Sequence, residues 1–169
     1  MLTLVWDETR RIPAAQLPAG AQQWRGVRDP NVSLWLLEDA DGLKTLAQSA
    51  GVAPDHVRVL SVVREWGDPS RKAARWANFV LREMTPESVE TFVPQLFGHT
   101  EKVIASPGCL GDTLAAEQGA PHHLLGITYW ESDAAFENYM QWASKHAWKG
   151  VVDPVTVDVP LRLFVQRID

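Results

Sequence analysis

Three side chains near the C-terminal end of the chain have a spacing that lets one helical face carry them together. Tyr139, Trp142 and His146 follow one another at intervals of three and four residues, which is the spacing of neighbours on a helix surface. Phe136 extends the same stripe by one turn. An imidazole beside aromatic rings can act as a base or hydrogen-bond partner for an aromatic ligand. The same stripe is equally typical of a hydrophobic core, so both interpretations stay open.

The elements that must position this stripe are predicted from the surrounding pattern. Strands are predicted over residues 75–84, 110–117, 122–130 and 155–167. Helices are predicted from Pro86, preceded by Thr85 as N-cap, and over residues 133–148, capped by Ser132. Pro94 and Gly98 interrupt the first helix, so a kink or two shorter pieces is expected. The order β-α-β-β-α-β is the ferredoxin-like motif of an α+β protein.

The N-terminal part repeats this order in a degenerate form. Strands are predicted over 2–9, 22–28, 32–37 and 56–66, with a shortened first helix over 12–20 and a second helix over 40–50. Residues 36–43 align without a gap against residues 129–136, so that strand end, acidic residue and helix start coincide. The predicted division is therefore a degenerate ferredoxin-like repeat (1–67), a linker (68–74) and a complete ferredoxin-like domain (75–169).

A ferredoxin-like sheet buries one face under its helices and leaves the other bare. Two such sheets can cover each other's bare faces. The tandem order therefore predicts an α+β barrel within one chain, an intrachain pseudo-dimer, with a homodimer as the alternative.

Composition and charge exclude several classes of function. A net charge of −5 argues against nucleic acid as a partner, and the longest basic cluster, Arg71-Lys72 with Arg75, is interpreted as a solvated connector. No apolar stretch approaches the roughly 18–20 residues of a membrane span. The single Cys109 and the early Asp7 favour a reducing, cytoplasmic location without a signal peptide. No metal-ligand spacing, phosphate-binding loop, dinucleotide motif or Ser/His/Asp order is present, so we expect no metal site.

Two motifs in the C-terminal part resemble a known family. The strand end Trp130-Glu131-Ser132-Asp133, followed by Phe136 and His146 on a helix, is similar to the antibiotic biosynthesis monooxygenases of the dimeric α+β-barrel superfamily. The run Ser106-Pro107-Gly108-Cys109-Leu110-Gly111 is similar to that family's approach to its second strand. Together with Asn78 on the first strand, the likeness extends over about residues 75–169.

The resemblance implies a function and a site. Cofactor-independent members oxidise aromatic or quinol-type molecules, whose own carbanion reduces oxygen, so a hydrophobic small molecule is the expected partner and no cofactor is needed. By this likeness the catalytic side chains are Asn78, Tyr139 and His146. The substrate-binding walls are Phe92, Trp130, Phe136, Trp142 and Trp148.

The same superfamily implies two alternatives. Heme-degrading members place an Asn on the first strand, a Trp on the second helix and a heme-ligating His further along that helix. Asn78 matches the first position, but Tyr139 stands at the position of the Trp and Trp148 at that of the His. His146, two residues away, is the heme ligand under this alternative. The second alternative is a non-catalytic small-molecule-binding or interaction protein.

Overall fold

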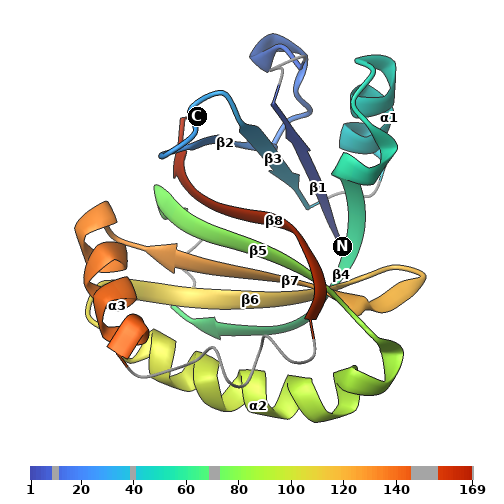
Figure 1. The fold of residues 1–169 in the computed structure, drawn as a ribbon. Coiled ribbons are helices and arrows are strands. Elements are labelled where there is room, and N and C mark those ends of the chain that lie inside the picture. The colour runs from blue at the N-terminus through green and yellow to red at the C-terminus, as the bar shows by residue number, and fades with distance from the viewer. Residues whose placement is uncertain (9–11, 39–40, 69–72, 146–155, 169) are drawn as a thin grey trace.

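The computed structural model describes residues 1–8, 12–38, 41–68, 73–145 and 156–168 (Figure 1). Its strands are β1 (Leu2–Asp7), β2 (Gln22–Gly26), β3 (Ser33–Leu37), β4 (Val57–Gly67), β5 (Trp76–Met84), β6 (Cys109–Glu117), β7 (Ala120–Trp130) and β8 (Thr156–Arg167). Its helices are α1 (Gly42–Ser49), α2 (Pro86–Ile104) and α3 (Asp133–Lys145), with short 3₁₀ helices η1 (Ala14–Gln16) and η2 (Pro54–His56).

The strands form one closed antiparallel barrel in the order β1-β3-β2-β8-β5-β7-β6-β4, and β4 pairs with β1 to close it. The first four strands run in the spatial order β4-β1-β3-β2, and the last four run in the corresponding order β8-β5-β7-β6. Each half therefore has the ferredoxin-like strand order, and the two sheets meet at the β2–β8 and β4–β6 pairs. Closure leaves no sheet edge exposed. The predicted α+β fold class is confirmed, whereas the domain division at 68–74 stays a prediction.

The main core lies inside the barrel. On β5, Ala77, Phe79 and Leu81 point inward, and all three side chains are fully buried. The alternate residues of the same strand point outward, because successive side chains of a strand face opposite sides. Trp24 packs edge-on against Phe79 with 5.7 Å between ring centroids, so the interior joins residues from both halves of the chain.

The outer faces of the two halves are covered unequally. Helices α2 and α3 both lie against the outer side of the last four strands, while α1 lies beside β1 (Figure 1). The predicted shortened helix over 12–20 is only the three-residue η1. Pro13 and Pro18 flank η1, and proline lacks the N–H that a longer helix would need. The C-terminal half therefore has two long helices over its outer face, and the N-terminal half has one short helix.

Helix α2 is continuous where the sequence suggested a kink or two shorter pieces. It begins at Pro86 after Thr85, as predicted, but it continues without a break through Pro94 to Ile104. The expected division into two shorter pieces is wrong. Pro94 and Gly98 lie on the exposed side, while Phe92 and Val103 on the opposite side are buried against the sheet and a neighbouring helix. Tertiary packing of one face outweighs the single lost hydrogen bond.

One end of the barrel interior contains an ionic cluster. Arg58 contacts Glu83 at 3.0 Å and Glu117 at 3.4 Å, and Nδ1 of His123 lies 2.7 Å from Glu117. These four side chains come from four different strands, and all are at most about a quarter exposed. The charges therefore compensate one another where the apolar packing ends. Within the described part of the chain, no helix has the length and hydrophobicity needed to cross a membrane.

Candidate functional site

A polar row crosses the outer face that α2 and α3 cover. The strand register places Asn78 of β5 opposite Thr128 of β7, and Thr128 opposite Asp112 of β6. Directly opposed residues on one sheet project their side chains to the same side. Phe164 of β8 and Trp66 of β4 stand at the two ends of this row. Polar groups are thus gathered in a row across the sheet face beneath the helices.

Asp112 is the ionisable group at the centre of this arrangement. Its side chain is 8% exposed, and one carboxylate oxygen accepts a hydrogen bond of 2.6 Å from the Thr128 hydroxyl. Burial raises the pKa of Asp112 to about 7, although the Thr128 hydrogen bond and the charge of Arg82 act in the opposite direction. A buried charge is costly because water no longer solvates it. Asp112 can therefore both take and release a proton near neutral pH.

Two further polar groups come from the helices. Nε2 of His99 on α2 lies 3.1 Å from the hydroxyl of Tyr139 on α3. Burial lowers the pKa of His99 to about 4, helped by the charges of Lys102 and Arg82. Burial also raises the pKa of Tyr139 to about 12. Both side chains are therefore uncharged at neutral pH, and they join the two helices by a neutral hydrogen bond.

The site also contains hydrogen-bond donors that the described residues leave unpaired. The indole N–H groups of Trp66 and Trp130 are buried without an acceptor in that part of the chain. The amide of Asn78 is half-buried on the same face and is a further donor. Leaving a buried donor unpaired costs free energy, so such groups need an explanation. Donors of this kind can stabilise negative charge that develops on a bound molecule.

Two glycines shape the packing around this row in opposite ways. A Cβ added at Gly126 on β7 would meet only the carbonyl oxygen of Val80, at 4.0 Å, so the face is open there. Gly108 has the opposite environment: its φ is +78°, and a Cβ would lie 2.5 Å from Cβ of Ala135. Only glycine tolerates both that backbone conformation and that approach. Gly108 therefore lets the first turn of α3 pack closely onto the sheet.

The predicted aromatic residues separate into buried and exposed groups. Trp130 is fully buried, Phe136 stacks on Phe164 with ring centroids 4.0 Å apart, and Tyr139 lies 5.2 Å from Trp130. Trp142 is 40% exposed, with its ring 6.1 Å from Tyr139. The structure thus brings these four predicted residues and Asn78 to one face.

The remaining predicted residues are placed differently. Phe92 is 1% exposed and packs with Trp66, Met84 and Leu114 in a separate cluster under α2. His146 and Trp148 lie outside the described residues. The predicted roles of these three residues stay predictions.

Asp112 and Thr128 have the geometry of site residues, yet sequence reasoning did not select them. One signal was available: Asp112 is an acidic residue inside an otherwise apolar predicted strand. A buried carboxylate in a strand interior is uncommon unless it has a specific role. Its partner Thr128 comes from the neighbouring strand, and only the register reveals that contact.

The equivalent place in the N-terminal half has no such chemistry. There the register places Val5 of β1 opposite Trp35 of β3, and Trp35 opposite Gln23 of β2. Val5 and Trp35 are fully buried and pack with Leu43 of α1. Large apolar side chains thus fill the space that polar groups line in the C-terminal half. The candidate site belongs to the C-terminal half.

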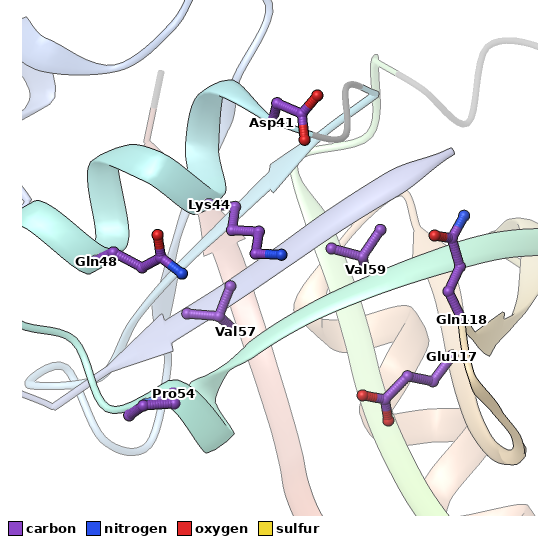
Figure 2. Close-up of a pocket in the computed structure, with 8 residues that line it drawn as sticks. All are labelled: Asp41, Lys44, Gln48, Pro54, Val57, Val59, Glu117 and Gln118. Carbon is purple, nitrogen blue, oxygen red and sulfur yellow. The ribbon is translucent and has the colours of Figure 1, made fainter.

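Two cavities lie away from this face. The first is a groove of about 420 Å³ between α1 and the start of β4, and Figure 2 shows Val57 and Val59 at its base. Lys44 and Gln48 line it from α1 and are exposed, while Glu117 is already paired with Arg58 and His123. The groove therefore lacks a buried polar group that requires a ligand. The second cavity, of about 310 Å³, opens into the barrel interior.

Comparison with known proteins agrees with this fold. The family model for antibiotic biosynthesis monooxygenase matches residues 78–150. No curated protein matches the chain. Among solved structures, an anthrone oxidase-like protein superposes with a TM-score of 0.69 at 14% identity, covering 99% of this chain and 91% of that one. A major regulator of staphylococcal pathogenesis superposes with a TM-score of 0.68 at 13% sequence identity, and the match covers 99% of each chain. A heme-degrading enzyme from Listeria monocytogenes superposes with a TM-score of 0.59 at 11% sequence identity, and the match covers 97% of this chain and 98% of that one.

The likeness to these solved structures shows that the protein has the fold of a ferredoxin-like α+β barrel. The family model for antibiotic biosynthesis monooxygenase matches residues 78–150, and the resemblance predicted from the sequence is confirmed. The matched segment contains Asn78, Asp112, Thr128 and Tyr139, so the polar groups of the row lie within the matched residues.

Proposed function

We propose that this protein is a cofactor-independent monooxygenase that oxidises an aromatic or quinol-type small molecule on the face beneath α2 and α3. The observation that carries the proposal is the buried Asp112, whose pKa of about 7 suits proton abstraction near neutral pH. A weakly acidic phenol or benzylic carbon must lose a proton before it can reduce oxygen. The anthrone oxidase-like protein with the same fold is consistent with this chemistry.

The proposed reaction balances without a cofactor. Asp112 takes one proton from an activated CH₂ group and leaves a carbanion delocalised over the aromatic system. The carbanion gives one electron to O₂, and the resulting radical and superoxide combine to form a C–O bond. Loss of water from the peroxide, with the proton returned, leaves a carbonyl. One CH₂ and one O₂ thus become one C=O and one H₂O.

The other residues have supporting roles in the proposal. The amide of Asn78 and the buried indole N–H of Trp130 are donors that can hold the developing enolate oxygen. Thr128 donates to Asp112 at 2.6 Å and so orients the carboxylate. Tyr139, with its high pKa, keeps its proton and acts as a neutral donor or wall. The predicted role of His146 as a base or hydrogen-bond partner stays part of the proposal.

Heme binding is the competing assignment. The predicted iron ligand, His146, lies outside the described residues. A described imidazole at this site is His99, and its neutral ring suits a metal ligand. Its Nε2, however, is already within 3.1 Å of the Tyr139 hydroxyl. Heme binding through His99 would have to break that hydrogen bond, so we rank the reaction without heme first.

Oxygen uptake tests the proposal directly. The purified protein is incubated with 1,8-dihydroxyanthrone or with hydroquinone, and O₂ consumption is followed with an electrode. We expect turnover with the anthrone, and kcat/KM that rises with pH through about 7 as Asp112 ionises. Asp112→Asn should lower kcat at least about 100-fold, whereas Asp55→Asn, an exposed carboxylate on η2, should leave it unchanged.

Three other outcomes would overturn the assignment. Turnover by Asp112→Asn equal to that of the unsubstituted protein would show that Asp112 is not the base. A saturable Soret band on hemin titration, abolished by His146→Ala, would support heme binding instead. Binding of the anthrone without any oxygen consumption would support the non-catalytic binding protein.

A further inference from the structure

The layer between the sheet and its two long helices has polar groups on both of its sides. On the sheet, the Thr128 hydroxyl donates to Asp112 within the polar row. On the helices, Nε2 of His99 on α2 lies 3.1 Å from the hydroxyl of Tyr139 on α3. Both helices lie against this outer face of the sheet (Figure 1). The His99–Tyr139 pair is therefore the helix-side counterpart of the polar row.

The position of His99 along α2 directs its side chain toward the sheet. Phe92, Leu96 and Val103 follow one another at intervals of four and seven residues, and they pack in the apolar clusters beneath the helix. His99 lies between Leu96 and Val103 on the same face, because residues three and four apart are neighbours on a helix surface. Its side chain is half-buried there. An ionisable residue thus lies on the face of α2 that packs against the sheet.

Electrostatic effects show that the groups on the two sides lie near one another. The charge of Asp112 contributes to raising the pKa of Tyr139, and the charge of Arg82 on β5 acts on Asp112, His99 and Tyr139 alike. Coulomb interactions weaken with distance, so side chains from two strands and two helices converge on one region. Since His99 and Tyr139 are uncharged at neutral pH, their pair suits a neutral polar group of a ligand.

Gly126 leaves room on the sheet side of this region. It lies two residues before Thr128 on β7, so both positions are on the helix-covered face. The register places Val80 of β5 and Leu114 of β6 on either side of it. A Cβ added at Gly126 would meet only the carbonyl oxygen of Val80, at 4.0 Å. The missing side chain therefore leaves a flat place beside the polar row for part of an aromatic ring.

We propose that His99 and Tyr139 together bind a hydroxyl group of the substrate, so that the molecule oxidised is a hydroxylated aromatic compound. Its ring lies over Gly126, with the activated carbon toward Asp112. This inference rests on the proposed function, because it names the group by which that site selects its substrate. A hydroxyl group both donates and accepts a hydrogen bond, so it fits between the pair whichever ring nitrogen of His99 carries the proton.

Binding exchanges one hydrogen bond for two. In the structure, Nε2 of His99 and the Tyr139 hydroxyl satisfy each other. A hydroxyl that enters between them bonds to both, so neither partner loses a hydrogen bond. A metal ion bound to His99 would instead leave the Tyr139 hydroxyl without that partner. The pair therefore favours a phenol over heme iron.

Two probes of similar shape test this preference without turnover. 2-Naphthol and 2-methylnaphthalene differ by a hydroxyl in place of a methyl group, and neither has the activated CH₂ group of the proposed substrate. Each is titrated into the full chain by calorimetry in the absence of oxygen. His99→Phe keeps a ring but removes both nitrogens. It should weaken 2-naphthol binding about tenfold and leave 2-methylnaphthalene binding unchanged. His99→Gln keeps hydrogen-bonding groups and should restore most of the affinity for 2-naphthol.

A second variant and a spectroscopic signal locate the hydroxyl. Tyr139→Phe should weaken 2-naphthol binding by a factor similar to that of His99→Phe. Thr91→Val, at an exposed position of α2, is the matched control and should bind both probes like the unsubstituted protein. The chain has two tyrosines, so ¹³C labelling at the tyrosine ring carbon that bears the hydroxyl gives one signal for each. We expect 2-naphthol to shift the signal of Tyr139 and not that of Tyr129, which packs inside the barrel.

The outcomes separate this inference from the proposed function. No binding of 2-naphthol would overturn the inference, as would binding that survives both His99→Phe and Tyr139→Phe. Equal weakening of both probes by His99→Phe would also overturn it, because His99 would then only hold the helices together. Oxygen uptake from 1,8-dihydroxyanthrone with unchanged kcat/KM in His99→Phe would keep the function and refute the inference. Hydroxyl-dependent binding of 2-naphthol without any oxygen uptake would refute the function and keep His99 as a binding residue.

Discussion

Replacing Asp112 by asparagine should change how the stability of the protein depends on pH. The folded carboxyl has a pKa of about 7, and its ordinary value is 3.8. Well below pH 3.8 the carboxyl is protonated in both the folded and the unfolded state, so it does not make stability depend on pH. Between those two values the folded state binds a proton that the unfolded state has released, so stability falls as pH rises. At about 1.4 kcal/mol per pKa unit, the full loss is about 4 kcal/mol.

The asparagine variant removes this titration while keeping the shape of the side chain and an acceptor for Thr128. The free energy of unfolding is measured by urea titration with tryptophan fluorescence, from about pH 4.5 to about pH 8. We expect the stability of Asp112→Asn relative to the unsubstituted protein to rise by about 3 kcal/mol over that range. Asp55→Asn, on the exposed η2, is the matched control and should show no such change.

A stability difference between the two proteins that stays constant with pH would refute the reasoning. It would mean that Asp112 titrates alike in the folded and unfolded states, and that its burial does not desolvate the charge. The proposed proton acceptor would then lose its main physical support. If the stability of Asp112→Asn relative to the unsubstituted protein fell with rising pH, the pKa of Asp112 would be depressed in the folded state. That would require a stronger cationic partner for Asp112 than the structure provides.

Three further predictions concern neighbouring groups. Tyr139→Phe removes the 3.1 Å hydrogen bond to His99 and should lower the free energy of unfolding by about 1 kcal/mol in urea titration. Cys109, whose pKa burial raises to about 11, should react with iodoacetamide about a hundredfold more slowly in the folded protein than in urea at about pH 8. Phe79→Ala should cost about 3–5 kcal/mol by the same titration, because Phe79 is fully buried in the barrel.

Local signals in the sequence located most elements of the C-terminal half. Thr85-Pro86 predicted the start of α2, and Ser132 predicted the start of α3, where its hydroxyl accepts a hydrogen bond of 3.2 Å from the N–H of Ala135. Capping depends on residues within one turn of each other, so it can be predicted without knowledge of the fold. Pro94 misled the prediction because a local rule expects a break where tertiary packing holds the helix together.

The site was only partly predictable for a related reason. Tyr139 and Trp142 share a helical face, and that spacing is visible in the sequence. Asp112 and Thr128 are sixteen residues apart, and their 2.6 Å hydrogen bond exists only because β6 and β7 pair in one register. A shift of that register by one residue would point Asp112 into the barrel interior. Long-range pairing of this kind leaves no local trace.

The sequence by itself determined the order of strands and helices, the helix starts, the family resemblance and the aromatic stripe of α3, because each of these depends on neighbours in the chain. Only the tertiary structure decided that the predicted barrel closes within one chain and that the polar row lies in the C-terminal half. It also decided that a separate cavity opens into the interior. The pKa of Asp112 belongs to this second group, because desolvation depends on everything packed around a carboxyl rather than on the residues beside it in the chain.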